Sequence, residues 1–196
     1  LRQSQELAVL ALIRLADNSP DTAATLLQNR WAKHLDAQQR AWAWGAIGKQ
    51  AAQKLSPDAL SLFANASPAD MNDEHLGWRT RAALRMGKWR DALEALQAMS
   101  PAASNEPTWV YWRARAMQAV AKTEPERLQA RQLLQTIAGV RGFYELLAQE
   151  ELGLPIGPPP QPEALTTAEK DTARNNPGLK RALAAIALGL RTEGVR

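Results

Sequence analysis

Bulky apolar residues recur in this chain at an interval of 34 residues, and this spacing constrains the fold more than any other feature. Trp78 begins the string WRTRA and Trp112 begins WRARA, so a W-R-x-R-A core occurs twice. Steps of the same length reach back to Trp44 and Leu10. This is the length of one helix-turn-helix unit in tetratricopeptide-type repeats. We therefore expect stacked helix pairs in which the recurring Trp packs each first helix against its neighbour.

The fold class that the composition predicts is all-α. Leu, Ala, Gln, Arg and Glu are frequent and strong strand formers are sparse, which favours helix nearly throughout the chain. The Gly and Tyr pattern and the terminal Pro of a regular tetratricopeptide unit are not kept. The prediction is a superhelix of tetratricopeptide-like antiparallel helix pairs with units of varying length.

Apolar periodicity and helix-start signals locate the individual helices. Gly87 suits a tight turn between two antiparallel helices. The expected helices span residues 3–17, 20–33, 37–54, a short segment from 56, 72–86, 88–99, 106–121, 125–138 and 141–153.

The last quarter of the chain differs from the rest. The string LPIGPPPQPEAL cannot be helical, because Pro lacks the backbone donor and fixes φ. We predict a superhelical domain at 1–153, a Pro-rich spacer at 154–164 and the start of a small helical linker domain at 165–196. An apolar stripe in 177–190 has no predicted packing partner. Together with a first residue that is not Met, this suggests a truncated or processed piece of a longer chain.

Several kinds of site are disfavoured. The chain has no Cys, and its two histidines, His34 and His75, lack ligand-like spacing, so we expect no metal and no cofactor, and surface or groove-edge positions for both. A net charge of +4 without a nucleic-acid signature argues against nucleic-acid binding. The longest apolar run, at 7–16, contains Arg14 and is too short to be a transmembrane segment.

Four strings resemble, in order, the non-catalytic region of periplasmic soluble lytic transglycosylases. They are WRTRAALRMGKWRDALEALQAM (78–99), WVYWRARAM (109–117), RGFYELLAQEELG (141–153) and LTTAEKDTARNNPGLKRALAAIALGLRTEG (165–194). The resemblance implies a U-shaped superhelix followed by a linker domain and a lysozyme-like catalytic domain. It also implies peptidoglycan as the substrate of the parent enzyme, a periplasmic location, and glycan strands, that catalytic domain and other cell-wall enzymes as partners.

The chemistry implied by the resemblance is cleavage between N-acetylmuramic acid and N-acetylglucosamine to a 1,6-anhydromuramyl end. In that family one Glu acts as general acid and then as base, within an E-S motif supported by G-L-M-Q and A-Y-N strings. None of these three motifs occurs in the 196 residues. We therefore assign no catalytic residue, and expect this chain alone to be inactive.

The candidate ligand-binding residues form two basic rows, one per repeat unit. Such rows would attract the carboxylates of peptidoglycan stems. The alternative is a solvated helix face with intramolecular pairing to acids such as Glu94 and Glu106. The rows comprise Arg79, Arg81, Arg85, Arg113 and Arg115.

The seven Trp allow two roles, sugar stacking and interhelical packing. Trp44, Trp78, Trp89 and Trp112 stand where helices must pack, and we expect packing for Trp31, Trp42 and Trp109 as well. The leading functional hypothesis is a non-catalytic scaffold that positions a transglycosylase catalytic domain. The alternative is a stand-alone tetratricopeptide-like adaptor that binds a peptide or protein.

Overall fold

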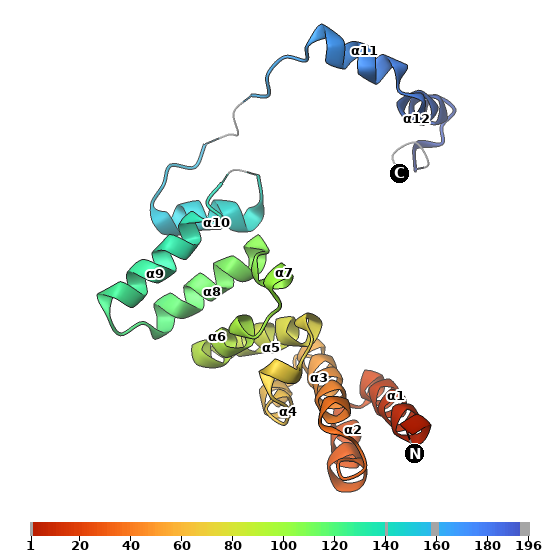
Figure 1. Ribbon diagram of the computed structural model, residues 1–196, viewed down its shortest axis with the longest axis vertical. Helices are drawn as coiled ribbons and strands as arrows, with labels where there is room; N and C mark the ends of the chain where they lie inside the picture. Colours follow the sequence, from red (N-terminus) through yellow and green to blue (C-terminus); the bar gives the residue numbers. More distant parts are fainter. Residues whose placement is uncertain (1, 140, 158–160, 193–196) are drawn as a thin grey trace. The chain divides into compact units, whose positions relative to one another are not determined.

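The computed structural model describes residues 2–139, 141–157 and 161–192, and within these ranges the chain is all-α, without strands (Figure 1). A π-helical turn, η1 (Leu27–Trp31), extends the second helix, and a 3-10 turn, η2 (Pro68–Asp70), precedes the fifth. The α-helices of the described residues are α1 (Arg2–Asn18), α2 (Pro20–Leu26), α3 (Ala37–Gln53), α4 (Ala59–Phe63), α5 (Asp73–Arg85), α6 (Trp89–Gln97), α7 (Pro101–Ser104), α8 (Pro107–Val120), α9 (Glu124–Gln135), α10 (Phe143–Leu152), α11 (Thr167–Asn175) and α12 (Pro177–Ala187).

The chain divides into two compact units, residues 1–157 and 158–196. The division falls inside the predicted 154–164 spacer, whose described residues are not helical. Residues 158–160 of that spacer and 193–196 of the predicted linker segment lie outside the described residues. No helix among the described residues is both long and apolar enough to cross a lipid bilayer.

The first unit consists of helix pairs that pack in chain order. α1 packs on α2, α3 on α4, α5 on α6, and α8 on α9. Neighbouring pairs are joined by contacts of α3 with both α1 and α5, and of α6 with α8, while α10 packs on α8 and α9. The predicted arrangement in packed helix pairs is thus confirmed.

The 34-residue interval marks the first helices of three pairs. Trp44 on α3 is buried, and Trp78 on α5 and Trp112 on α8 are partly buried against the core. Leu10, the fourth expected anchor, is 61% exposed. The buried apolar residues of α1 fall on its other face, at Val9, Leu12 and Ala16, so the periodicity does not extend to Leu10.

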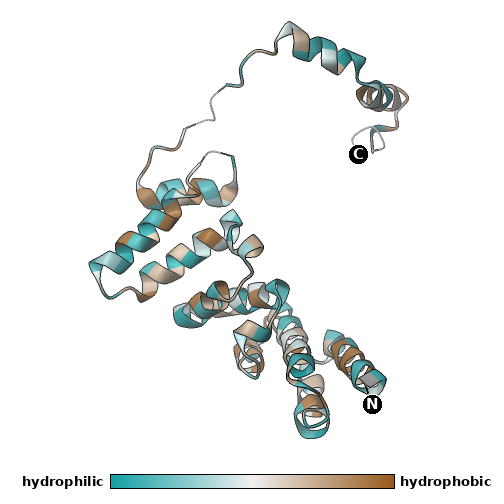
Figure 2. Ribbon diagram, in the orientation of Figure 1, coloured by the Kyte–Doolittle hydropathy of each residue, from teal (hydrophilic) through white to brown (hydrophobic). Residues whose placement is uncertain are grey.

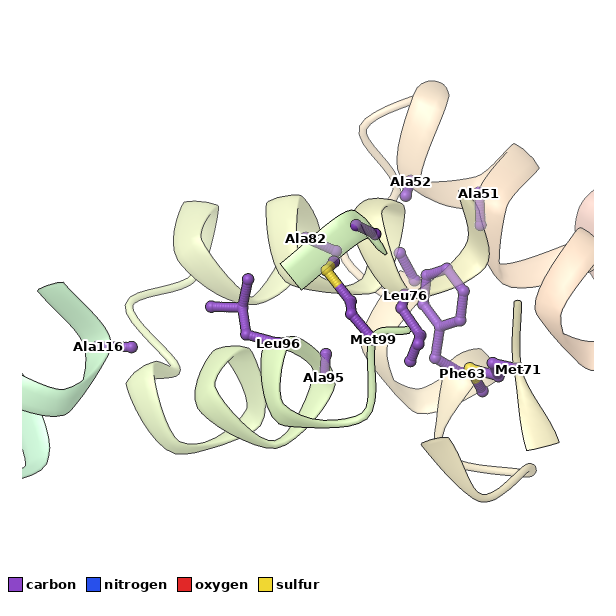
Figure 3. Packing of buried hydrophobic residues seen from close by; sticks show 12 residues of the cluster. Ala51, Ala52, Phe63, Met71, Leu76, Ala82, Ala95, Leu96, Met99 and Ala116 are labelled. Atoms are coloured by element: carbon purple, nitrogen blue, oxygen red, sulfur yellow. The ribbon is translucent and has the colours of Figure 1, made fainter. Parts of the chain in front are cut away.

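Three hydrophobic clusters follow one another through the first unit. The first joins α1, α2 and α3, the second spans α3 to α8, and the third joins α8, α9 and α10. In the second cluster, Phe63 is fully buried and lies beside Leu76 (Figure 3). Partly buried Trp112 contacts both the second and the third clusters, so adjacent cores are linked by shared residues.

Local signals in the sequence explain where several helices begin and end. At the start of α3, Asp36 Oδ1 accepts a hydrogen bond from the backbone N–H of Gln39, and Gln39 Oε1 accepts one from the N–H of Asp36. This capping box satisfies two amide donors that the helix leaves unpaired. Gly87, between α5 and α6, has φ of +67°, which confirms the predicted tight turn.

Two expected helices differ from their predicted bounds. The helix expected at 20–33 is regular only to Leu26 and continues as the π-helical turn η1. The helix expected from residue 56 is limited to the five residues of α4, because turns occupy residues 57 and 58 and the chain turns again after Phe63. Apolar periodicity alone does not mark these interruptions.

The second unit contains α11 and α12, which contact each other. Figure 2 shows α11 as mainly hydrophilic, whereas α12 carries hydrophobic residues. The stripe predicted in 177–190 is exposed, with Leu179 at 43%, Leu183 at 58%, Ile186 at 39% and Leu190 at 53%. That this apolar face lacks a packing partner stays a prediction.

Candidate functional site

The five arginines that the sequence singles out lie on α5 and α8, but their environments differ. Arg79 is buried, with 8% of its side chain exposed, and its Nη2 donates to Glu94 Oε2 at 2.8 Å. Its Nη1 is buried without a hydrogen-bond partner among the described residues. Arg79 therefore forms an intramolecular ion pair of the kind that the alternative interpretation of the basic rows expected.

Arg115 is also engaged inside the unit. Its Nη1 pairs with the Glu151 carboxylate of α10 and lies 3.1 Å from the Tyr111 hydroxyl. The guanidinium lies 5.9 Å from the centroid of the Tyr111 ring. Arg115 thus links α8 to α10 and adds a polar contact at the edge of the third hydrophobic cluster.

Arg81 has a different environment, formed by aromatic rings. Its guanidinium carbon lies 5.0 Å from the Trp78 ring centroid and 4.9 Å from that of Trp109. Both distances are within the range of cation–π attraction. The residue is exposed and makes no ion pair with any residue that the structure describes.

The remaining two arginines form no ion pair with a described residue. Arg85 Nη2 donates to the backbone carbonyl of Ser56 at 2.9 Å. Arg113 is half-buried and forms no ion pair within the described ranges. The members of the two basic rows thus have different environments: Arg79 and Arg115 are in ion pairs, and Arg81 lies close to two aromatic rings. Arg85 bonds to a backbone carbonyl, and Arg113 has no ion pair within the described ranges. Ligand binding by these residues stays a prediction.

Two hollows lie beside aromatic residues of the first unit. One, of about 280 Å³, is lined by Arg81, Leu84, Thr108, Trp109, Trp112 and Tyr144. A larger one, of about 790 Å³, lies between α1 and the start of α3 and includes Val9, Ile13 and Trp42. Trp42 is 48% exposed and packs its ring against His75, whereas the other six Trp are buried or partly buried against the clusters.

His75 corrects another expectation from the sequence. It is only 4% exposed, with its ring 5.6 Å from that of Trp42 in an edge-on arrangement, and its Nδ1 has no partner among the described residues. Burial lowers the pKa of His75, and the nearby Lys49 ammonium adds to this, while Glu74 opposes it. The burial depends on Gly45 of α3, a partner far away in sequence, so helical periodicity around residue 75 could not predict it.

The carboxylates with resolved pKa shifts do not resemble a catalytic acid. A hydrogen bond from Lys49 lowers the pKa of Glu74. Backbone N–H groups of Lys122 and Thr123 lower that of Glu126, and the Thr166 hydroxyl and N–H lower that of Glu169. A general acid requires a raised pKa, so these three glutamates are shifted in the opposite direction.

Within the described residues, no group of three or more His, Asp or Glu is arranged to hold a metal ion.

No protein-family model matches the chain, and no curated protein does. Among solved structures, the chain is similar to an inactive mutant of the lytic transglycosylase Slt from Pseudomonas aeruginosa, with a TM-score of 0.72 and 26% sequence identity. The match covers 95% of this chain and 30% of that one, so the chain spans less than a third of the similar protein. The all-helical chain therefore resembles a part of the lytic transglycosylase Slt, in agreement with the resemblance that the sequence strings carried.

Proposed function

We propose that this chain is the non-catalytic scaffold region of a soluble lytic transglycosylase that acts on peptidoglycan in the periplasm. The observation that carries the proposal is the similarity to Slt over 95% of this chain. In addition, the 196 residues contain none of the E-S, G-L-M-Q and A-Y-N strings. A segment that shares the helical architecture but lacks the catalytic motifs would support the chemistry without performing it.

In this proposal the helix pairs form a tetratricopeptide-like superhelix that holds the lysozyme-like catalytic domain of the parent protein. The physical basis is the continuity of the three hydrophobic clusters, in which each helix pair packs on the next. Such linked cores resist bending between neighbouring pairs, because displacing one pair would expose the apolar surface of another. The first unit would therefore keep a catalytic domain at a fixed place along a glycan strand.

A second candidate function is the tetratricopeptide-like adaptor, with a peptide or protein as its ligand. The hollow of about 790 Å³ between α1 and α3 favours it, because its lining combines apolar side chains with polar and acidic ones. The polar and acidic members are Gln5, Glu6, Asp36, Gln38 and Gln39. Pockets of several hundred Å³ with mixed lining are typical ligand sites. The two proposals differ in what they bind and in whether a catalytic domain depends on the chain.

The first experiment is to incubate the purified chain with isolated sacculi. Co-sedimentation is measured, and the supernatant is analysed by mass spectrometry for 1,6-anhydromuropeptides. The scaffold proposal predicts that the chain sediments with the sacculi and releases no product. Release would overturn the non-catalytic assignment.

A second experiment tests positioning directly. The matched segment of Slt is replaced by this chain, and anhydromuropeptide release by the hybrid is compared with release by Slt lacking that segment. The scaffold proposal predicts higher release from the hybrid. Equal release from the two proteins, together with no sedimentation of the free chain, would favour the adaptor.

A further inference from the structure

Arg81 is the one arginine of the basic rows whose guanidinium lies close to two aromatic rings. Trp78, on the same helix, and Trp109, on α8, place their ring centroids 5.0 Å and 4.9 Å from its guanidinium carbon. A long arginine side chain normally loses several rotatable degrees of freedom when it binds a ligand. Contacts with two rings restrict those degrees of freedom beforehand, so binding at Arg81 would cost less entropy.

The position of Gly77 makes this arrangement possible. A Cβ atom at residue 77 would lie 3.0 Å from Cζ2 of Trp109 and 3.2 Å from Nη1 of Arg81. A side chain there would press on the Trp109 ring and the guanidinium, and these groups would have to shift by a few tenths of an ångström. The absence of a side chain at residue 77 thus leaves room for the present positions of Trp109 and Arg81.

The charge of Arg81 is not used within the described part of the chain. Arg79 pairs with Glu94, and Arg115 pairs with Glu151, whereas no carboxylate forms an ion pair with Arg81. Arg81 is an exposed residue, and the planar set of donors of a guanidinium matches the two oxygens of a carboxylate. Arg81 thus offers an oriented positive charge that the fold itself does not neutralise.

The hollow beside Arg81 adds a second requirement for the ligand. Its volume is about 280 Å³, and its other walls are Leu84, Thr108, Trp109, Trp112 and Tyr144. Leucine and aromatic side chains favour an aliphatic group, and the Thr108 and Tyr144 hydroxyls offer hydrogen bonds. A ligand that satisfies the whole site carries a carboxylate next to a small aliphatic side chain.

We propose that Arg81, Trp78, Trp109 and the adjoining hollow form a binding site for the free carboxylate of a short peptide. The carboxylate would form a two-point hydrogen bond with the guanidinium, and the neighbouring side chain would occupy the hollow. The assignment of this ligand to the peptide stems of peptidoglycan rests on the proposed function. The geometry of the site itself does not depend on it.

The test is calorimetric titration of the purified chain with three probes. These are an alanine-rich tripeptide with a free carboxylate, the same tripeptide with a C-terminal amide, and a stem-free glycan fragment. The first should bind and the other two should not. Arg81→Gln should weaken binding of the free acid by about tenfold or more, because a charge-assisted hydrogen bond is lost. The affinity of Arg81→Lys for the free acid should lie between those of the unchanged chain and Arg81→Gln. An ammonium group keeps the charge but cannot form the planar two-point contact.

Arg90→Gln is the matched control, since Arg90 is exposed on α6, forms no ion pair with a described residue and loses the same charge. It should bind the free acid as the unchanged chain does. Equal affinity for acid and amide, no binding of the acid, or wild-type affinity in Arg81→Gln would each overturn the proposal. The comparison of the acid and the amide on the unchanged chain tests recognition of the free carboxylate even if a variant fails to fold. If the chain binds the peptide but does not sediment with sacculi, the Arg81 site is supported, and its assignment to the peptide stems of peptidoglycan is contradicted.

Discussion

The imidazole ring of His75 packs directly on Gly45, so that a Cβ atom at residue 45 would lie 2.8 Å from Cγ of His75. Gly45 is in the middle of α3 and His75 is in the first turn of α5, and both are buried. The two helices approach closely at this point because residue 45 has no side chain. Their contact connects the second and third helix pairs of the first unit.

The variant Gly45→Ala tests this contact. Alanine in an exposed helix interior stabilises a protein by about 1 kcal/mol relative to glycine. Here the added methyl group would overlap the His75 ring, and overpacking of this kind costs about 1–3 kcal/mol. We expect a lower free energy of unfolding in urea. The double variant Gly45→Ala with His75→Ala should lose less free energy of unfolding than the sum of the losses in the two single variants. Strictly additive losses would argue against the contact.

The stability of the first unit should fall as the pH drops below the ordinary histidine pKa. His75 has an ordinary pKa of 6.5 that burial lowers in the folded state. Between the lowered and the ordinary pKa, the unfolded chain binds a proton that the folded chain does not. The contribution of neutral His75 to the free energy of unfolding is therefore complete above pH 6.5 and declines below it. Urea unfolding at about pH 7.5 and about pH 5.5 should show a larger loss in the unchanged chain than in His75→Gln.

The exposed His34 provides the control for this pH dependence. His34→Gln should retain the loss of stability of the unchanged chain. If His75→Gln retains it as well, protonation of His75 does not oppose folding and the effect comes from other groups.

The ion pair between Arg79 and Glu94 should contribute more than the exposed pairs. Arg79 is buried, so Glu94→Gln would leave its charge without a carboxylate. Since Glu94 is 57% exposed, water screens part of this loss, and we expect a decrease of about 1–2 kcal/mol in the free energy of unfolding. Glu124→Gln, which removes the partner of exposed Arg127, should cost less than about 0.5 kcal/mol. Equal losses would show that burial of Arg79 adds nothing.

Much of the helix arrangement could be predicted from the sequence because it follows from local periodicity. Trp44, Trp78 and Trp112 mark first helices, and each is buried or partly buried. Gly87 marks a turn because few other residues adopt positive φ. These signals lie within a few residues of the feature that they predict.

The environments of individual side chains were harder to predict, because they depend on neighbouring helices. Arg79 and Arg81 are two residues apart in one basic row, yet one is buried against Glu94 and the other lies between Trp78 and Trp109. Trp42 is exposed although Trp44 is buried, since residues two apart on a helix face different directions. Which face meets a neighbour is decided by packing between pairs.

The first unit should fold without the second. The three hydrophobic clusters lie within the first unit, so it has a core of its own. Removing residues 158–196 should therefore leave the Tm and the unfolding free energy of the remaining chain unchanged, as measured by circular dichroism on heating and by urea titration. The matched control is Leu134→Ala, which truncates a fully buried side chain of the third cluster and should cost about 2–5 kcal/mol in either background. A clear fall in Tm after the truncation would show that the second unit stabilises the first.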